Sequence, residues 1–246
     1  MERWAREAGD IQLRYFRSTH LDISEKLNAF DVVTTADKES ERYLIGKIRT
    51  AYPDHSILSE ESGSDSRKGE WRWIIDPLDG TTNFSSGLPV FSVSIGLEHR
   101  GKVVAGVVFA PYLNELFKAI KGKGATMNGR PIRCSDKSQL ATSVLATGVP
   151  YDKDRNPDNN LDNICRLAVK VRGIRRYGSA AMDLCYVAAG YLDGYWEMGI
   201  NIWDVAAGQL IATEAGAKTV SFRNDRNIAV IAANPALLDI LRKEIQ

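Results

Sequence analysis

The hydrophobic pattern of the chain changes period from segment to segment, and these changes predict its elements. Apolar residues spaced three or four apart are typical of helices, and strict alternation is typical of half-buried strands. Helices are expected at 2–17, 37–52, 158–171, 179–188, 203–216 and from 235 onward. Strands or extended segments are expected at 26–35, 56–59, 73–75, 90–98, 103–109, 115–120, 143–147, 194–198, 218–222 and 228–232, with a further strand after the Asn128-Gly129 turn.

The order of these elements divides the chain into two parts that differ in secondary structure. Residues 1–135 are rich in strands, with an antiparallel meander through 90–120 and helices outside it. Residues 136–246 alternate strands with helices, which favours a mixed sheet covered by helices. We therefore expect an α+β (mixed α/β) fold and a single catalytic unit, 1–246, made of two closely packed halves.

Composition narrows the class of protein. The 246 residues are 44% apolar and 26% charged, as in soluble globular proteins. Lys and Arg number 32 against 31 Asp and Glu, which gives a net charge of +1. This leaves no surplus of positive charge for a nucleic-acid-binding face, and none is expected. No apolar run reaches the roughly 20 residues that cross a bilayer, and the start MERWAREAGD has acids where a signal peptide has an apolar core. A cytoplasmic location with no membrane association is expected.

Cysteine and histidine do not suggest a reactive or metal-binding cluster. The three cysteines, Cys134, Cys165 and Cys185, are an odd number and are expected to be core thiols. The histidines, His20, His55 and His99, are scattered over expected surface segments and are predicted to be solvated. This pattern argues against a zinc hydrolase and against phosphatases that use a histidine or cysteine nucleophile.

One stretch, WIIDPLDGTTNFSSG at 73–87, suggests specific chemistry. An apolar strand ends in Asp76 and Asp79, three positions apart with Pro77 between them, so that both carboxylates can turn toward one place. Two half-buried anions repel each other unless a cation joins them, and oxygen ligands suit a hard ion such as Mg2+. The following Gly80-Thr81-Thr82 offers a glycine turn, exposed N–H groups and hydroxyls, which together can hold a phosphate.

Three motifs in order make the chain resemble a known family. They are SEESG at 59–63, DPLDGTTNF at 76–84 and WDVAAG at 203–208. The chain resembles the inositol monophosphatase family of metal-dependent, lithium-sensitive phosphatases from Trp4 to about Leu238. The resemblance implies a layered α-β-α-β-α sandwich of the sugar-phosphatase type, and a homodimer, because the family is usually dimeric.

The resemblance also implies roles for individual residues. The implied ligands of two or three Mg2+ ions, for which Mn2+ can substitute, are Glu60, Asp76, the main-chain carbonyl of Leu78, Asp79 and Asp204. The implied catalytic residues are Asp37, Glu60 and Thr81, with Thr81 linked to Asp37 and orienting a metal-bound water. The implied substrate contacts are Gly80, Thr81, Thr82, Gly178, Ser179, Ala180, Glu197 and Asp204.

Several of these residues also have a purely structural explanation. Asp37, Ser179 and Asp204 stand at expected helix starts, where they can serve as caps. Glu197 can be a surface acid of its strand. Adjacent strand residues face opposite ways, so Glu61 is expected to point away from the site or to support it.

Other positions have no settled role. Lys26 matches a basic residue near the phosphate in relatives, or it is solvated. Residues 62–70 are expected to form a loop, which by resemblance is mobile and helps to complete the site. Asn201 stands where animal enzymes usually carry histidine, which leaves the exact polyol open.

The function expected from this resemblance is Mg2+-dependent hydrolysis of inositol monophosphate by direct attack of water. The main alternative is a dual fructose 1,6-bisphosphate and inositol monophosphate phosphatase, in which Arg172, Arg175 and Arg176 would bind the second phosphate unless they are surface charges or dimer contacts. Histidinol phosphate and adenosine 3′,5′-bisphosphate are further candidate substrates. An alternative of another class is a binding partner of the transcription machinery with secondary enzymatic activity.

Overall fold

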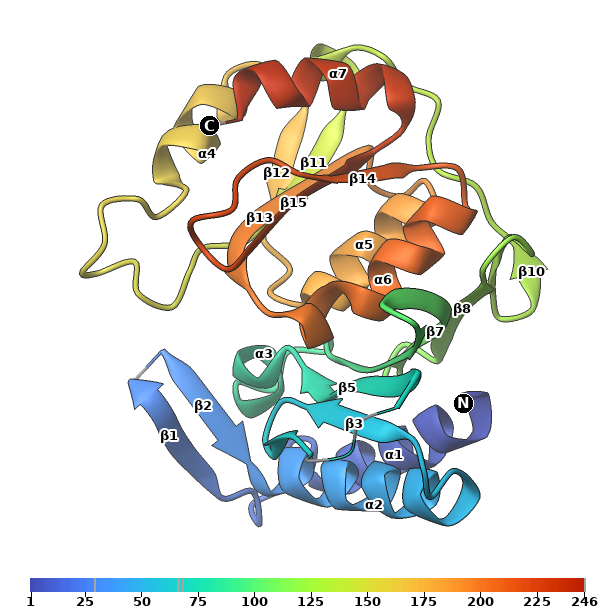
Figure 1. Ribbon diagram of the computed structural model, residues 1–246. Coiled ribbons are helices and arrows are strands. Elements are labelled where there is room, and N and C mark those ends of the chain that lie inside the picture. Colours follow the sequence, from blue (N-terminus) through green and yellow to red (C-terminus); the bar gives the residue numbers. More distant parts are fainter. Residues whose placement is uncertain (29, 66, 68, 246) are drawn as a thin grey trace.

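The computed structural model describes residues 1–28, 30–65, 67 and 69–245 and arranges them in five layers (Figure 1). Helices α1 and α2 cover the outer face of an eight-stranded sheet, and α5 and α6 lie between this sheet and a five-stranded one. Helices α4 and α7 cover the far face of the second sheet. The predicted α-β-α-β-α sandwich is confirmed. The helices are α1 (Glu2–Tyr15), α2 (Thr35–Ala51), α3 (Thr81–Ser85), α4 (Leu161–Ala168), α5 (Ala180–Ala188), α6 (Ile202–Glu214) and α7 (Pro235–Glu244).

The larger sheet belongs to the first part of the chain and has the order β10-β9-β8-β7-β6-β5-β3-β4. All its neighbouring strands are antiparallel except β3 and β5, so the predicted meander is confirmed. Its strands are β3 (Ser56–Ser59), β4 (Gly63–Ser64), β5 (Trp71–Asp79), β6 (Ser92–His99), β7 (Lys102–Ala110), β8 (Glu115–Ile120), β9 (Ala125–Met127) and β10 (Arg130–Pro131). The expected loop 62–70 thus contains β4, and positions 66 and 68 of that loop lie outside the described residues.

The smaller sheet has the order β12-β11-β13-β15-β14 and is mixed, as predicted. Strand β11 runs parallel to both of its neighbours, and the other pairs are antiparallel. Its strands are β11 (Val144–Thr147), β12 (Gly173–Arg175), β13 (Gly194–Ile200), β14 (Lys218–Ser221) and β15 (Ile228–Ala233). A separate hairpin, β1 (Ile23–Asn28) and β2 (Asp31–Thr34), projects beside the first sheet (Figure 1).

Small residues of the WDVAAG motif allow α6 to pack closely on the larger sheet. A Cβ atom on Gly106 of β7 would lie 3.0 Å from the Cα of Ala207, and one on Gly96 of β6 would lie 3.3 Å from the Cβ of Ala206. On the other side, a Cβ on Gly208 would lie 2.8 Å from the Cβ of Leu184 in α5. Larger side chains would force these elements apart, because packed interiors leave little spare volume. The motif therefore fixes the position at which α6 begins.

Helix α4 begins three residues later than the expected 158–171. Asn160 adopts a left-handed φ of 72° and is buried, so that its side chain points into the protein instead of starting the helix. Its Nδ2 donates to the carbonyl of Gly148 (2.7 Å), and its Oδ1 accepts from Nε1 of Trp196 (2.8 Å). These bonds connect the start of α4 to the loop after β11.

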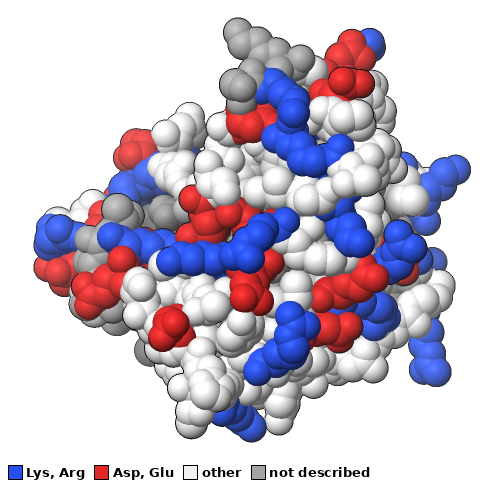
Figure 2. All heavy atoms as spheres, turned by 90° about the horizontal axis from the view of Figure 1, so that it is seen from below, with Lys and Arg blue, Asp and Glu red and all other residues white. Residues whose placement is uncertain are grey.

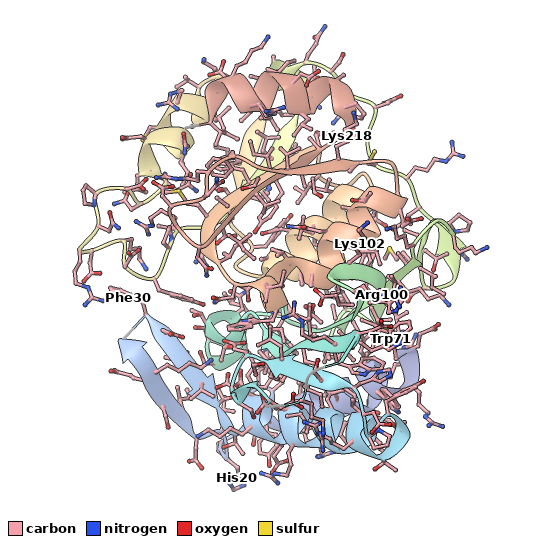
Figure 3. The ribbon with its side chains drawn as sticks, in the orientation of Figure 1. His20, Phe30, Trp71, Arg100, Lys102 and Lys218 are labelled. Atoms are coloured by element: carbon pink, nitrogen blue, oxygen red, sulfur yellow. The ribbon has the colours of Figure 1, made fainter. Side chains whose placement is uncertain are left out.

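Two predictions about single residue types are wrong in part. Cys185 is buried, but Cys165 is exposed on α4, and all three thiols are free. His20 is exposed as predicted (Figure 3), whereas the rings of His55 and His99 both stack on the ring of Trp71. Nδ1 of His55 also accepts a hydrogen bond from Nε1 of Trp73 (3.1 Å). Sequence alone could not show that these rings meet, because β5 and β6 bring them together only through strand pairing.

Two global features agree with the composition. Figure 2 shows basic and acidic side chains interspersed on the face of the molecule seen from below. Among the described residues, no helix combines the length and the apolar character that a membrane span needs.

Candidate functional site

The site begins at an irregularity in β5. The register between β5 and β6 shifts at this point, because Asp76 pairs with Ser94 but Asp79 pairs with Ser92. Strand β5 therefore has one more residue than β6 between the two pairs. Pro77 lies inside the slip and has no N–H to give to a ladder, which favours a bulge at this point. Nε2 of Gln12 in α1 donates to the Pro77 carbonyl (2.7 Å) and holds it from behind. Both carboxylates are consequently delivered to a nearly buried position, 1% and 7% exposed.

Helix and strand ends bring three further acids toward this point. Glu60 follows β3 directly, and its N–H donates to the Ile75 carbonyl of β5 (3.2 Å). Asp204 stands at the third position of α6, where its Oδ2 accepts from the N–H of Asn201 (2.6 Å). Asp37 holds the same position in α2, so its structural explanation as a cap is confirmed. Capping fixes these side chains, and it leaves one oxygen of each for another partner.

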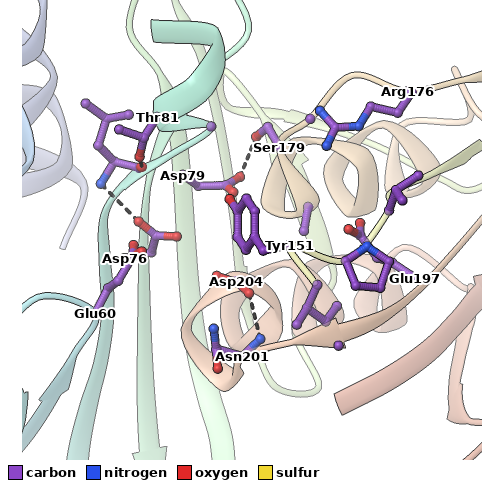
Figure 4. A pocket seen from close by; sticks show the side chains of 18 residues that line it. Glu60, Asp76, Asp79, Thr81, Tyr151, Arg176, Ser179, Glu197, Asn201 and Asp204 are labelled. Carbon is purple, nitrogen blue, oxygen red and sulfur yellow. Dashed lines mark hydrogen bonds between the residues drawn. The ribbon is translucent and has the colours of Figure 1, made fainter. Parts of the chain in front are cut away.

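A single cavity of about 670 Å³, including its open mouth, collects most of the predicted site residues (Figure 4). Predicted residues that line it are Glu60, Asp76, Leu78, Asp79, Gly80, Thr81, Gly178, Ser179, Ala180, Glu197 and Asp204. Residues not assigned a role in it from sequence are Val149, Pro150, Tyr151, Gly199 and Ile200, and the two of open role that also line it are Arg176 and Asn201. Two predicted residues lie elsewhere: Thr82 is exposed outside the cavity, and Asp37 is fully buried behind Thr81.

Each cavity carboxylate is held by protein donors through one oxygen. Oδ1 of Asp76 accepts from the N–H of Leu78 (3.0 Å). Oδ2 of Asp79 accepts from the N–H of Ala181 (3.0 Å) and, in a short bond, from the hydroxyl of Ser179. Ser179 also caps α5, since its Oγ accepts from the N–H of Met182 (3.4 Å). The second carboxylate oxygens therefore remain for a ligand of the cavity.

Burial makes these carboxylates costly to ionise. It raises the pKa of Asp76, Asp79 and Asp204 above the ordinary range, and the nearby Glu60 carboxylate adds to the rise at each. All-oxygen donors with surplus negative charge fit a hard divalent cation, which would offset this repulsion. Among the described residues, no three His, Cys, Asp or Glu side chains lie close enough together to hold a metal ion in their present positions.

A hydrogen bond between Thr81 and the buried Asp37 lies behind the cavity. Oγ1 of Thr81 lies 3.0 Å from Oδ1 of Asp37 and 3.0 Å from the carbonyl of Leu78, both of which can accept its proton. Oδ2 of Asp37 is already occupied by the hydroxyl and N–H of Thr34 (2.5 and 2.9 Å). Burial raises the pKa of Asp37 to about 6, although the hydrogen bonds from Thr34 and Thr81 oppose the rise.

Lys26 of the β1–β2 hairpin ion-pairs with two acids at the edge of the cavity. Its Nζ donates to Oε1 of Glu60 (2.7 Å) and to Oε1 of Glu61 (2.5 Å). Lys26 is therefore neither solvated nor free, and although partial burial opposes its charge, the two carboxylates raise its pKa. Of the two alternatives for Glu61, pointing away from the site is wrong, because β3 ends at Ser59 and both glutamates contact Lys26 from the turn that follows. The contact with Lys26 beside Glu60 agrees with the other alternative, a supporting position.

The far end of the cavity contains Glu197, which is not a surface acid. A side chain on Gly148 would overlap the Glu197 carboxylate, with Oε1 only 1.7 Å from the Cβ position. Oε2 of Glu197 accepts from the hydroxyl of Tyr195 (2.7 Å). Arg176 lines this part of the cavity, whereas Arg172 and Arg175 are exposed and do not line it.

Sequence reasoning missed one buried acid and one aromatic residue near the site. Asp183 of α5 is 1% exposed, neither of its oxygens has a hydrogen-bond partner in the described part of the chain, and burial raises its pKa well above normal. The sequence signal that could have revealed Asp183 is an acid among the apolar residues of the helix AAMDLCYVA. Tyr151 follows a Gly148-Val149-Pro150 turn in a polar loop, and no period or motif distinguishes it.

A metal-free preparation is predicted to lose stability as pH rises. Asp37, Asp76, Asp79 and Asp204 have native pKa values above those of the unfolded chain, so their contribution is complete below about pH 4 and is lost as pH rises through about 6 and beyond. The Tm in a chelator should fall between pH 5 and 8, and millimolar Mg2+ should flatten this slope. Equal slopes with and without Mg2+ would contradict the electrostatic description.

Loss of the Lys26 ammonium should destabilise the metal-free protein more than the Mg2+-loaded one. In Lys26→Met the two glutamates lose their cation, at a cost of about 1–2 kcal/mol, and a divalent ion bound at Glu60 would restore the balance. Thermal unfolding with chelator and with Mg2+ measures the difference. Lys170→Met is the matched control, because the Lys170–Glu244 ion pair (2.6 Å) joins the turn after α4 to the end of α7 and lies outside the cavity. A Tm loss that is the same in both conditions for Lys26→Met would argue against the idea.

Comparison with known proteins agrees with this geometry. A profile of the inositol monophosphatase family matches residues 1–245. The chain is 43% identical over 250 residues to Nus factor SuhB of Pasteurella multocida, covering 99% of this chain and 93% of that one. It is 49% identical over 195 residues to inositol-1-monophosphatase of Synechocystis sp., covering 79% and 68%. The crystal structure of extragenic suppressor protein suhB from Bartonella henselae superposes with a TM-score of 0.93 at 39% identity, covering 99% of this chain and 96% of that one. The chain belongs to the inositol monophosphatase family, whose enzymes are generally metal-dependent phosphatases.

Proposed function

We propose that this chain is a Mg2+-dependent phosphatase that hydrolyses inositol monophosphate by direct attack of water on phosphorus. The observation that supports this most is one cavity with two chemically different ends. Buried carboxylates suited to cations lie at one end, and Glu197, suited to accepting hydroxyl protons, lies at the other. Because both parts of the chain line this cavity, we regard residues 1–246 as one catalytic unit.

The proposed metal ligands are the residues of the acidic end. Glu60, Asp76, Asp79, Asp204 and the carbonyl of Leu78 would hold two or three Mg2+ ions. Such ions lower the pKa of bound water and offset the charge on a phosphoryl group and a leaving alkoxide. Mn2+ can take the same oxygen ligands.

Thr81 and Asp37 would prepare the attacking water. When the Thr81 hydroxyl donates to Oδ1 of Asp37, its lone pairs face outward and can accept a proton from that water. Asp37, whose pKa is about 6, is a suitable final acceptor near neutral pH. Asp37 does not line the cavity, so it would act on the water only through Thr81.

The phosphoryl group would sit against the start of α3. Gly80 adopts a φ of 90° and precedes the helix, where the first N–H groups have no partner within the helix. A Cβ at Gly80 would lie 3.0 Å from the Val90 carbonyl, so a larger residue would displace this turn. Since Thr82 is exposed outside the cavity, we assign the phosphate contacts to Gly80 and Thr81 alone.

The polyol would occupy the end formed by β13 and the start of α5. Glu197 accepts one hydrogen bond from Tyr195 and has a second oxygen for adjacent hydroxyls of a polyol. Gly178, Ser179 and Ala180 form the adjoining wall. Asp204 stands between the two ends and would contact both the metal and the leaving alcohol.

Substitution of a central ligand tests the mechanism. Asp79→Asn keeps an oxygen that can accept from Ser179 and Ala181 but removes the charge, so the fold should persist while Mg2+-dependent phosphate release from inositol 1-phosphate falls at least about a hundredfold. Circular dichroism and Tm check the fold. Asp10→Asn, an exposed acid of α1, is the control and should be unaffected. Normal turnover by Asp79→Asn would refute the proposed site.

Arg176 favours a second candidate substrate, a sugar bisphosphate such as fructose 1,6-bisphosphate. It is a cation at the alcohol end of the cavity, where a second phosphate could meet it. Assays of both substrates with wild type and Arg176→Ala separate the candidates, with histidinol phosphate and adenosine 3′,5′-bisphosphate in the same series. A loss of about tenfold or more confined to the bisphosphate would identify the dual enzyme. An equal effect on both substrates would argue against a second phosphate site.

Four remaining features of the proposal rest on membership of the family. We propose a homodimer, a cytoplasmic location and inhibition by lithium. Because the Pasteurella multocida relative is named a Nus factor, we also propose a second role as a partner of the transcription machinery. That second role predicts a cellular effect that survives Asp79→Asn, which the enzymatic role does not.

A further inference from the structure

Among the described residues that line the cavity, Tyr151 is the aromatic one, and the proposed reaction gives it no role. It reaches the cavity from the loop between β11 and α4, with about half of its surface exposed at the mouth. Figure 4 shows its ring between Asp79 and Asp204. The position is therefore accessible from solvent and adjacent to the acidic end.

The loop follows the cavity from one chemical end to the other. At Gly148 the backbone lies against the Glu197 carboxylate, since no side chain would fit between them. Val149 and Pro150 continue along the wall. Tyr151 then meets the acidic end, where burial, followed by the carboxylates of Asp204 and Glu60, raises the pKa of its hydroxyl. Its hydroxyl consequently lies where the polyol end and the metal end of the cavity join.

Bonds on both sides of Tyr151 hold the loop in this course. Before it, the Gly148 carbonyl accepts from Asn160 (2.7 Å). After it, Oδ1 of Asp152 accepts from Nη2 of Arg226 (2.7 Å), and Arg226 in turn donates to the Asp158 carbonyl (2.7 Å). A residue held at both neighbours loses little additional freedom when a ligand binds, which favours a role in recognition.

Two further contacts fit the loop to its surroundings. Gly199, with a φ of 75°, has no side chain, and a Cβ there would come within 3.3 Å of Pro150. Nζ of Lys153 lies 3.9 Å from the ring centroid of Phe30, at the tip of the β1–β2 hairpin (Figure 3). The hairpin thus contacts this loop two residues after Tyr151.

The chemistry of a tyrosine suits this junction. At neutral pH its hydroxyl is protonated and donates a hydrogen bond without adding charge to an acidic cavity. Its ring offers an apolar face to the C–H groups of a ring-shaped alcohol. Its ring lies beside Asp204 (Figure 4), the acid that the proposed function places next to the leaving alcohol, so both features would meet that alcohol.

We propose that Tyr151 is a specificity-determining residue, whose hydroxyl donates to an oxygen of the leaving polyol beside the ester bond and whose ring covers the adjacent C–H face. The inference rests on the proposed phosphatase function and adds a preference among alcohols. A leaving group that has ring hydroxyls next to the ester should gain from Tyr151, and a flat phenol should not.

Kinetics with two substrates test this preference. Tyr151→Phe should lower kcat/KM for inositol 1-phosphate about fivefold to tenfold, the value of one hydrogen bond, and leave kcat/KM for p-nitrophenyl phosphate within about twofold. Tyr151→Ala should widen the difference by removing the ring. Tyr52→Phe, an exposed tyrosine of the aromatic cluster beyond α2, is the matched control and should change neither value. Equal losses for both substrates, or no loss for either, would overturn the proposal.

A binding measurement separates this inference from the proposed function. Calorimetry with inositol 1-phosphate in the presence of Ca2+ in place of Mg2+ measures binding directly, and Tyr151→Phe should weaken binding there by a similar factor. If wild type releases no phosphate from any substrate but the Tyr151 variant still binds inositol 1-phosphate more weakly, the proposed function fails and the contact stands. Unchanged binding in the Tyr151 variants would refute the contact even if the enzyme is active.

Discussion

The structure depends on holding like charges together away from water. Asp76, Asp79 and Asp204 come from two distant parts of the sequence and meet in a cavity where burial opposes their ionisation. Isolated carboxylates in such surroundings would be protonated or would turn outward. Main-chain N–H groups prevent the second outcome by fixing one oxygen of each, and a divalent cation would prevent the first.

The fold provides these fixed donors through irregular points of otherwise regular elements. The β5 bulge turns Asp76 and Asp79 in the same direction, and the starts of α2 and α6 provide the caps that orient Asp37 and Asp204. Close packing of the small residues of α6 on β6 and β7 then sets the separation of the two groups of acids. The motif WDVAAG thus combines a proposed metal ligand, Asp204, with the small residues whose close packing positions it.

Sequence could predict most of the elements and the acidic residues, because their signals are local. Periodicity located the meander and the described helices except the short α3, and the bulge region was recognisable from its proline and two aspartates. Features that depend on tertiary contacts were not predictable in the same way. The turn after β3 sends both Glu60 and Glu61 to Lys26, the stacking of His55 on Trp71 requires strand pairing, and Tyr151 enters the cavity only because Asn160 and Arg226 shape its loop.

Asp37 and Asp204 are helix caps and, in the proposed function, site residues as well, so the acidic end and the loop that would recognise the alcohol depend on different parts of the fold. These acids are built into helix starts, so replacing them would disturb both folding and the reaction, and drift at such positions is strongly penalised. The loop from Gly148 to Asn160 contributes no cap to the acidic end, and its tip can change without disturbing those helices. New leaving groups would therefore be accommodated by changes in this loop alone, with the proposed hydrolytic centre left intact.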